Sequence, residues 1–366
     1  MILRDTFRRF DWILFASVVV LLAMGSMAIT SVALSRDVPD WQHIAKHGTY
    51  VALALGIIFF GATIDYRALR AWNRVSYVGG ILLLLAVLFL GSTIRGTRGW
   101  FSFAGMTFQP VEITKIIFLV FLATYFERWA RESDRIRHVL LSGLGACVYL
   151  ALIFLQPDTG SAFLFFSVWF SLLVIIGIRR RHFVALIALC AVFGMIAWVF
   201  LLHNYQRERI MTFFEPSRDP LGRGYNTAQA KIAVGGGQFF GRGFGFGSQS
   251  QLRFLPEAET DFIFAVIAEE WGFVGATLLL TAWGLCFWRI FITLRRVRDD
   301  FALFFLIGAL LLFFIEVSVT IGMNIGLVPV TGLTLPFVSY GGSSLLAHAM
   351  ILAIVQSIII RNPIVR

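Results

Sequence analysis

Hydrophobic residues occur along this chain in long blocks, and the short segments between the blocks hold most of the charged residues. A block of about 20 apolar residues is long enough to cross a lipid bilayer as a helix. Such blocks predict ten spans, at residues 12–34, 46–64, 76–91, 110–126, 139–155, 160–178, 183–202, 272–292, 302–322 and 344–360. We therefore expect an all-α, polytopic membrane protein with a single transmembrane domain over residues 1–366.

The composition narrows the class of protein further. Hydrophobic residues make up 58% of the chain and charged residues only 14%, whereas soluble proteins have about 45–50% apolar and about 25% charged residues. This balance excludes a soluble enzyme, a disordered chain and a disulfide scaffold.

The net charge of +10 is explained by basic residues in the loops of a membrane protein. Basic residues gather in the cytoplasmic loops of membrane proteins, so this excess does not call for a nucleic-acid partner. If the N-terminus lies inside, every inner segment has at least two Lys or Arg, and the short outer loops at 156–159 and 323–335 have none. We expect both termini of this multi-pass protein in the cytoplasm.

The segment between spans seven and eight, residues 203–271, is a large outer loop. Loops of this length are usually functional or disordered. The segment is rich in Phe, Leu, Ile and Tyr and ends in an apparent amphipathic helix at 261–270. We expect it to pack onto the bundle and partly into the bilayer edge, so that any chemistry faces outward.

Residues 235–247 of this loop hold seven glycines in thirteen positions. The segment lacks the Lys and Ser/Thr of a nucleotide-binding phosphate loop and does not follow a strand. Two interpretations remain open: a surface loop whose backbone approaches a ligand closely, or a flexible connector.

Two charged residues lie inside span four. A charge in the hydrocarbon region costs about 2.5–3.5 kcal/mol on insertion scales. Glu112 and Lys115 are three residues apart, on one helical face. They either neutralise each other or line a polar cavity near the outer surface, where Lys115 could contact an anionic head group.

Two outer carboxylates and Glu269 are candidates for chemistry. Asp158 lies in a tight turn, where it either caps the next helix or contacts substrate. With Thr260 as N-cap, Asp261 would occupy the first turn of a helix, where the dipole favours its ionised form. Glu269 lies about 80° from Asp261 around that helix, so it could share the same cavity.

Two further segments have residue types that suit an anionic ligand. Arg98 with Arg95 on an outer rim suits a pyrophosphate, while Trp100 beside them is equally explained as an interfacial anchor. Ser339 lies in a glycine- and hydroxyl-rich break before the last span and has no adjacent base. Amide groups at that helix start are better suited to holding an anion than Ser339 is to covalent catalysis. The spacing of the histidines makes a zinc site improbable.

Several stretches together resemble the SEDS (shape, elongation, division and sporulation) family, and its elongation members more than its division members. The matching stretches are GTRGWF, FQPVEITKI, LQPDTGSAF, the segment from YQRERIMTFFEPSRDP to FLPEAETDFIFAVIAEEWGFVGA, and GMNIGLVPVTGLTLPFVSYGGSS. They cover most of the chain in family order.

The resemblance implies a peptidoglycan glycosyltransferase that polymerises lipid II at the outer face of the cytoplasmic (inner) membrane and releases undecaprenyl pyrophosphate. It implies a role in cell elongation and shape maintenance, beside a class B penicillin-binding protein in the elongation complex, with no organic cofactor. By motif match, Asp261 corresponds to the family's essential outer-loop aspartate. The family's other sensitive motifs contain Arg98, Trp100, Glu112, Lys115, Asp158 and Glu269.

The chemistry of sugar transfer gives these residues roles. We expect Asp261 to deprotonate the acceptor hydroxyl, either directly or as ligand of a divalent cation such as Mg²⁺ or Mn²⁺. Arg98 and Lys115 would offset the charge of the departing pyrophosphate.

Two other functions stay open. A lipid II flippase or other transporter would also use ten spans and intramembrane charges, with Glu316 as the residue to support transport; a satisfied buried carboxylate is the alternative. A non-catalytic scaffold for a cell-wall complex would tolerate substitution of Asp261.

Overall fold

The computed structural model describes residues 8–35, 40–94, 96–103, 106–130, 136–202, 204–215 and 223–362. The chain forms two compact units. Unit 1 consists of Met1–Arg67, Pro216–Val297 and Phe313–Arg366, and unit 2 of Ala68–Glu215 and Arg298–Leu312. Because each unit draws on separate stretches of the chain, the expectation of one domain over residues 1–366 stays a prediction.

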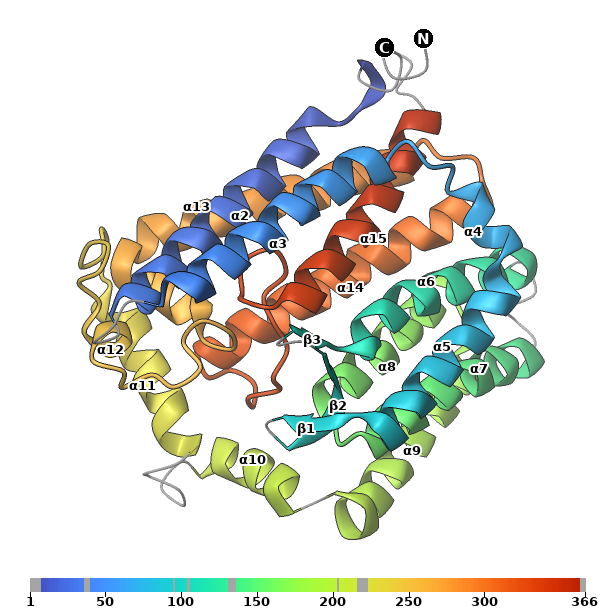
Figure 1. Cartoon of the computed structure of the whole chain (residues 1–366). Coiled ribbons are helices and arrows are strands. Elements are labelled where there is room, and N and C mark those ends of the chain that lie inside the picture. The colour runs from blue at the N-terminus through green and yellow to red at the C-terminus, as the bar shows by residue number, and fades with distance from the viewer. Residues whose placement is uncertain are drawn as a thin grey trace. The chain divides into compact units, whose positions relative to one another are not determined.

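Unit 1 is a bundle of long helices (Figure 1). Its elements are α2 (Trp12–Leu34), α3 (Trp41–Gly61), α11 (Arg223–Gly236), α12 (Ser248–Gln251), α13 (Ile263–Leu294), the second half of α14 (Asp300–Asn324) and α15 (Gly342–Arg361). Helix α15 packs along α3, and α13 packs along both α2 and α11. Nearly all of the α15 side chains between Ser344 and Ile360 are buried, so this helix lies in the core of the unit.

Unit 2 combines helices with a small sheet (Figure 1). Its helices are α4 (Arg67–Ala71), α5 (Asn73–Leu90), α6 (Pro110–Trp129), α7 (Ile136–Leu155), α8 (Thr159–Ile176), α9 (Arg180–Ile196) with the π-helical turn Ala197–Leu201, α10 (Asn204–Phe214) and the first half of α14. Strands β1 (Ser92–Ile94), β2 (Thr97–Phe103) and β3 (Met106–Phe108) pair antiparallel in that order. The sequence predicts only a connection between two spans here, and the strands are an addition of the structure.

The predicted spans coincide with helices of the structure. In the described part of the chain, nine helices are long and apolar enough to cross a membrane. The remaining predicted span is α6, a 20-residue helix that is outside this group and holds charged residues at Glu112, Lys115, Glu127 and Arg128. The prediction of an all-α, polytopic membrane protein is confirmed, with one three-stranded sheet added.

The end of the outer loop differs from the expectation. Residues 261–270 do not form an amphipathic helix, because every side chain from Ile263 to Glu270 is buried. Asp261 precedes the helix, and Phe262 rather than Thr260 is the N-cap residue of α13. The Thr260 hydroxyl is instead bonded to Glu257, through the carboxylate at 3.0 Å and the backbone carbonyl at 3.3 Å.

Helix α13 is broken at Gly272, whose φ of 62° and ψ of −156° are not helical. The glycine-rich segment fills this break with backbone hydrogen bonds in both directions. The carbonyls of Glu269 and Glu270 accept from the N–H groups of residues 242 and 243, at 3.0 and 2.9 Å. The N–H groups of Phe273 and Val274 donate to the carbonyls of residues 238 and 239, at 2.9 and 3.2 Å. The helix therefore bends without leaving these backbone groups unpaired.

Glycine is required where the two backbones meet. A Cβ at Gly237 would lie 1.8 Å from the Ala268 carbonyl oxygen, and one at Gly241 would lie 2.1 Å from that of Glu270. The glycines thus permit a close approach of backbone to backbone, and the partner is α13 of the same chain rather than a ligand. The alternative of a flexible connector does not fit these contacts.

Gly241→Ala is expected to lower stability by about 1–3 kcal/mol, because a backbone carbonyl cannot move aside for the new methyl group. The positive φ of Gly241, 80°, adds strain for any other residue. Thermal unfolding of the detergent-purified protein measures the effect. Gly235→Ala is the matched control, since nothing lies within 4 Å of its Cβ position. Equal unfolding temperatures for the two variants would contradict the role assigned to this contact.

Candidate functional site

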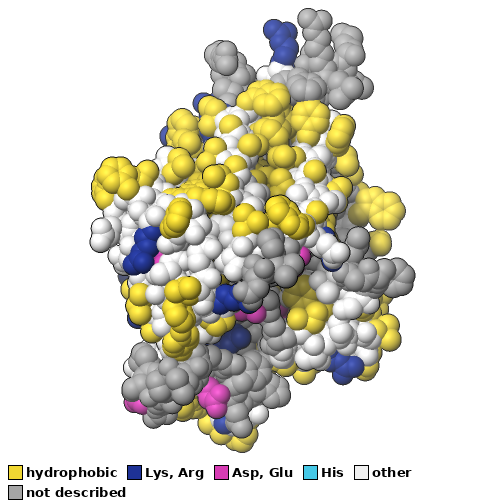
Figure 2. Space-filling model, turned by 60° about the vertical axis from the view of Figure 1, so that its left-hand side comes forward, with side chains coloured by type: hydrophobic (Ala, Val, Ile, Leu, Met, Phe, Trp, Pro, Cys, Tyr) yellow, Lys and Arg dark blue, Asp and Glu magenta, His cyan; other side chains and the backbone are white. Residues whose placement is uncertain are grey.

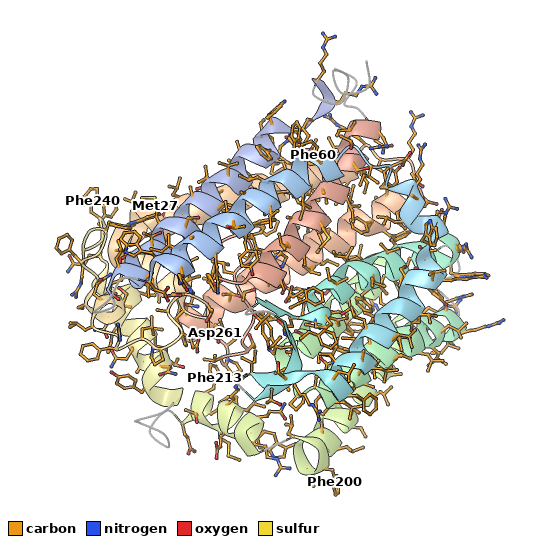
Figure 3. The ribbon with its side chains drawn as sticks, viewed as in Figure 1. Met27, Phe60, Phe200, Phe213, Phe240 and Asp261 are labelled. Atoms are coloured by element: carbon orange, nitrogen blue, oxygen red, sulfur yellow. The ribbon has the colours of Figure 1, made fainter. Side chains whose placement is uncertain are left out.

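Asp261 lies in a tight turn directly before α13, which we call the Asp261 turn, residues 257–262 (Figure 3). The turn begins at Glu257, which has a positive φ of 56°. The carbonyl of Glu257 accepts hydrogen bonds from the N–H groups of Thr260 at 3.1 Å and Phe262 at 3.3 Å. These bonds close the turn, and Asp261 is left partly exposed within it.

Three successive carbonyls of the turn are bonded to the C-terminal part of unit 1. The Glu259 carbonyl accepts from the Tyr340 N–H at 2.8 Å. The Thr260 carbonyl accepts from the Ser339 hydroxyl at 2.7 Å. The Asp261 carbonyl accepts from the side-chain amide of Asn324 at 2.8 Å. Together these bonds, which we call the carbonyl clamp, fix the backbone that carries the Asp261 side chain.

Asn324 is fully buried at the end of α14 and completes the start of α13. Its Nδ2 also donates to the Thr320 carbonyl at 2.7 Å, and its Oδ1 accepts from the Ala265 N–H at 2.9 Å. The first N–H groups of a helix have no partner within it, so Asn324 supplies a cap from a distant helix. Asn324 is not recognisable as a functional residue from the sequence, where its one signal is an amide at the end of an apolar span.

The side chain of Glu259 is held as well. Its carboxylate lies 2.5 Å from His43 Nε2 of α3. The His43 ring stacks on that of Tyr340, with centroids 3.9 Å apart. His47, one turn further along α3, contacts the Ser26 hydroxyl at 3.2 Å. The described residues contain no group of three or more His, Cys, Asp or Glu side chains that could hold a metal ion.

Ser339 has a structural part in this site. Its hydroxyl donates to Thr260 and accepts from the Leu335 N–H at 2.9 Å. The residue thereby ties the loop before α15 to the Asp261 turn. The expectation that it contacts substrate stays a prediction.

Glu269 is fully buried and binds the start of α12. Its carboxylate accepts from the backbone N–H groups of Gln249 at 2.8 Å and Ser250 at 3.2 Å, and from the hydroxyls of Ser248 and Ser250. The neighbouring Glu270 accepts from the Ser31 hydroxyl of α2. Both carboxylates thus hold the outer segment to the bundle, and a substrate contact by Glu269 stays a prediction.

In unit 2, Glu112 and Lys115 form the expected pair on one face of α6. Lys115 Nζ lies 3.0 Å from Oε1 and 2.9 Å from Oε2 of Glu112. The exposed fraction of the Lys115 side chain is 1% and that of Glu112 is 7%. Such burial favours mutual neutralisation over an open polar cavity.

Asp158 caps α8, which was one of its two interpretations. Its carboxylate accepts from the Ser161 backbone N–H at 3.0 Å and from the Ser161 hydroxyl at 2.7 Å. It also accepts from the side-chain amide of Gln109, the residue before α6, at 3.4 Å. Asp158 therefore links the starts of α6 and α8, and a contact with substrate stays a prediction.

Arg98 and Trp100 lie on β2 rather than in an irregular loop. The exposed Arg98 guanidinium donates to the carbonyls of Phe89 at 3.1 Å and Gly91 at 3.3 Å, at the end of α5. Trp100 is half-buried and pairs with Ser92 of β1. Arg98 thus presents a positive charge at the surface of unit 2, although two of its donors are engaged.

Glu316, the residue that could have supported transport, is satisfied inside unit 1. It is fully buried and lies 2.8 Å from His348 Nε2 of α15. His348 in turn contacts the Ser344 hydroxyl at 3.3 Å, and Ser344 contacts Thr334 at 2.8 Å. These contacts fit the second interpretation of Glu316, a buried carboxylate whose hydrogen-bonding needs are met within the protein.

Comparison with known proteins identifies the family. Residues 11–362 match the FtsW/RodA/SpoVE family of cell cycle proteins. The chain belongs to this family. It is 34% identical over 366 residues to the probable peptidoglycan glycosyltransferase FtsW of Haemophilus influenzae, covering 98% of this chain and 92% of that protein. It is 38% identical over 315 residues to the peptidoglycan glycosyltransferase MrdB of Escherichia coli K12, covering 84% and 83%.

Solved structures of the family have the same fold. A chain from a peptidoglycan synthase complex that coordinates polymerisation and crosslinking superposes with a TM-score of 0.80 at 32% identity, covering 96% of this chain and 97% of that one. The rod-shape-determining protein RodA of Thermus thermophilus superposes with a TM-score of 0.70 at 28% identity, covering 96% and 97%. The resemblance to the SEDS family is confirmed.

Lys115→Met alone is expected to destabilise this FtsW/RodA/SpoVE family member by about 3–5 kcal/mol, because it leaves Glu112 buried without a counter-charge. The double variant Glu112→Leu with Lys115→Met removes both charges and should recover most of that loss. Thermal unfolding in detergent measures both, with Lys46→Met, at an exposed position on α3, as the control for loss of one charge. A double variant less stable than the single one would contradict the neutralisation account.

Proposed function

We propose that this chain is a peptidoglycan glycosyltransferase. It polymerises lipid II into glycan strands at the outer face of the cytoplasmic membrane and releases undecaprenyl pyrophosphate, in cell elongation and shape maintenance. The family match and relatives named peptidoglycan glycosyltransferases support this proposal. The observation that carries it is the carbonyl clamp, which fixes the backbone of a turn with a partly exposed aspartate.

The reaction requires a base. The 4-hydroxyl of the acceptor sugar attacks the anomeric carbon of the donor sugar, and the hydroxyl proton must leave as the new bond forms. Asp261 accepts this proton in our proposal. A base is effective only when it is held within hydrogen-bond reach of the proton. The carbonyl clamp restricts the backbone motion that would otherwise move Asp261 out of reach.

The reaction also requires positive charge at the leaving group. The donor's bond to pyrophosphate breaks, and the pyrophosphate departs with its lipid. In unit 2, Arg98 has an exposed guanidinium suited to a phosphate, whereas Lys115 already has Glu112 as its partner. We therefore assign Arg98 the larger part in offsetting the pyrophosphate charge and Lys115 a smaller one.

The side chains around Asp261 would supply only some of the ligands that a divalent cation needs. The described residues contain no cluster of three or more potential ligands, so a site made wholly of these side chains is not present among them. Magnesium is commonly held by one or two carboxylates together with substrate phosphates. Asp261 meets that requirement as a single carboxylate, and Mg²⁺ or Mn²⁺ would supply positive charge to the pyrophosphate.

The proposal places the protein in a cellular context. It is a multi-pass protein of the inner membrane with both termini in the cytoplasm and the Asp261 turn facing outward. Its partner is a class B penicillin-binding protein, which cross-links the strands within the elongation complex. The similar chain in a synthase complex of polymerisation and crosslinking supports this partner. The proposed role in elongation rather than division rests on the sequence motifs, because relatives of both kinds are similar to this chain.

A flippase or transporter has less support. Its best candidate residue, Glu316, is fully buried and engaged with His348. This contact joins α14 to α15 within the core and does not require a transport path.

Asp261→Asn is expected to lower polymer formation by about 10²–10⁴-fold, because the amide cannot accept the acceptor proton. The measurement is the purified protein with labelled lipid II and its transpeptidase partner, read as polymer on a gel. Glu208→Gln is the matched control, since it removes an exposed carboxylate from α10 to which the proposal gives no role. Near-normal polymer from the Asp261→Asn protein would remove Asp261 from the mechanism.

Added EDTA separates the two roles of Asp261 in the same reactions. Loss of polymer with EDTA, restored by Mg²⁺ or Mn²⁺, supports Asp261 as a metal ligand. Full activity in EDTA supports direct proton transfer and excludes the metal.

A further inference from the structure

The glycine-rich segment exposes large aromatic side chains, and we call residues 237–246 the Phe loop. The exposed fractions are 56% for Phe239, 78% for Phe240, 44% for Phe244 and 76% for Phe246. Figure 3 shows Phe240 pointing away from the helices at one end of unit 1. A cluster of this kind on a soluble surface marks a binding site for an apolar partner.

The Phe loop cannot withdraw these rings by folding inward. Its backbone is bonded to both sides of the break in α13, through the groups of residues 238, 239, 242 and 243. The close contacts at Gly237 and Gly241 leave no room beneath it. The rings are therefore held outward by the same bonds that stabilise the bend.

The loop is continuous with the lipid-facing surface of a span. The Phe239 ring stacks on that of Phe273, with centroids 5.7 Å apart. Phe273 and Val274 have exposed fractions of 61% and 46% on the part of α13 that follows the break. Exposed apolar side chains on a membrane-spanning helix face lipid, and Gly272 coincides with the predicted start of span eight. The Phe loop thus lies where this span enters the membrane.

The charge of the segment suits the head-group region. Residues 235–254 contain two arginines, Arg242 and Arg253, and no acidic residue. Both arginines are exposed, and the Arg242 guanidinium donates to the Ser248 hydroxyl at 2.8 Å and to the Gly236 carbonyl at 3.4 Å. Figure 2, which brings this side of the molecule forward, shows hydrophobic side chains over much of the face with scattered Lys and Arg. Aromatic rings beside arginines are typical of elements that lie in a membrane interface.

We propose that the Phe loop is a membrane anchor that inserts into the bilayer leaflet on the Asp261 side. Its phenylalanines lie at the boundary between head groups and acyl chains, and Arg242 and Arg253 face lipid phosphates. Because the loop is bonded to residues 269 and 270 of α13, it sets the depth of the short helix that follows Asp261. The anchor would hold the Asp261 turn at the membrane surface, where a lipid-linked sugar arrives.

The test measures the surroundings of the loop directly and does not depend on enzymatic activity. Phe240→Cys is introduced after replacing the three native cysteines, and the full chain is labelled with a small fluorophore in lipid nanodiscs. Nitroxides at shallow and deep positions of the acyl chain report lipid contact, and iodide reports water. Leu278→Cys, in the middle of α13, and Glu257→Cys, exposed in the Asp261 turn, provide the lipid and water references.

The anchor predicts that the label at residue 240 is quenched more by shallow than by deep nitroxides, and several-fold less by iodide than the label at residue 257. Phe246→Cys is a second position that keeps the test valid if the first variant folds poorly. Strong iodide quenching without lipid quenching would overturn the proposal. Protection from iodide only after the transpeptidase is added would also overturn it, since the loop would then bind a protein.

Discussion

Hydrogen bonds to three successive backbone carbonyls hold the turn that carries Asp261, and the rest of the site depends on them. The donors are a backbone N–H, a hydroxyl and a buried amide, contributed by Tyr340, Ser339 and Asn324. Each bond adds only about 0.5–1.5 kcal/mol, but a buried carbonyl left without a donor costs more. Three such bonds in a row hold the main chain of the turn, so the backbone that carries the carboxylate keeps a defined position.

The outer segment between α11 and α13 is fixed at its other end by equivalent means. The backbone bonds across the break at Gly272 join the Phe loop to α13. The carboxylate of Glu269 joins α13 to α12, and that of Glu270 joins α13 to α2. Residues 237–262 are therefore tied at both ends to unit 1. These buried carboxylates use their hydrogen-bonding capacity for structure, which distinguishes them from Asp261.

The sequence predicted much of this architecture and little of its detail. Apolar blocks located the spans because hydrophobic length is a local property, and Asp158 was recognisable as a cap from its immediate neighbours. Asn324 and Ser339 act on residues 63 and 79 positions away. Bonds over such separations follow from tertiary packing and leave no periodic signal. Thr260 resembled an N-cap because it precedes an apolar run, but its hydroxyl is bonded to Glu257 and the helix begins later.

The most direct test of this account is a double-mutant cycle between Ser339 and Asp261. Ser339→Ala frees the Thr260 carbonyl, and we expect a fall of about 3–10-fold in the turnover of lipid II with little change in KM. In the Asp261→Asn background, Ser339→Ala should cause no further loss, because the clamp acts through the carboxylate that has been removed. An equal loss from Ser339→Ala in both backgrounds would show that the clamp acts independently of Asp261 and would contradict the account.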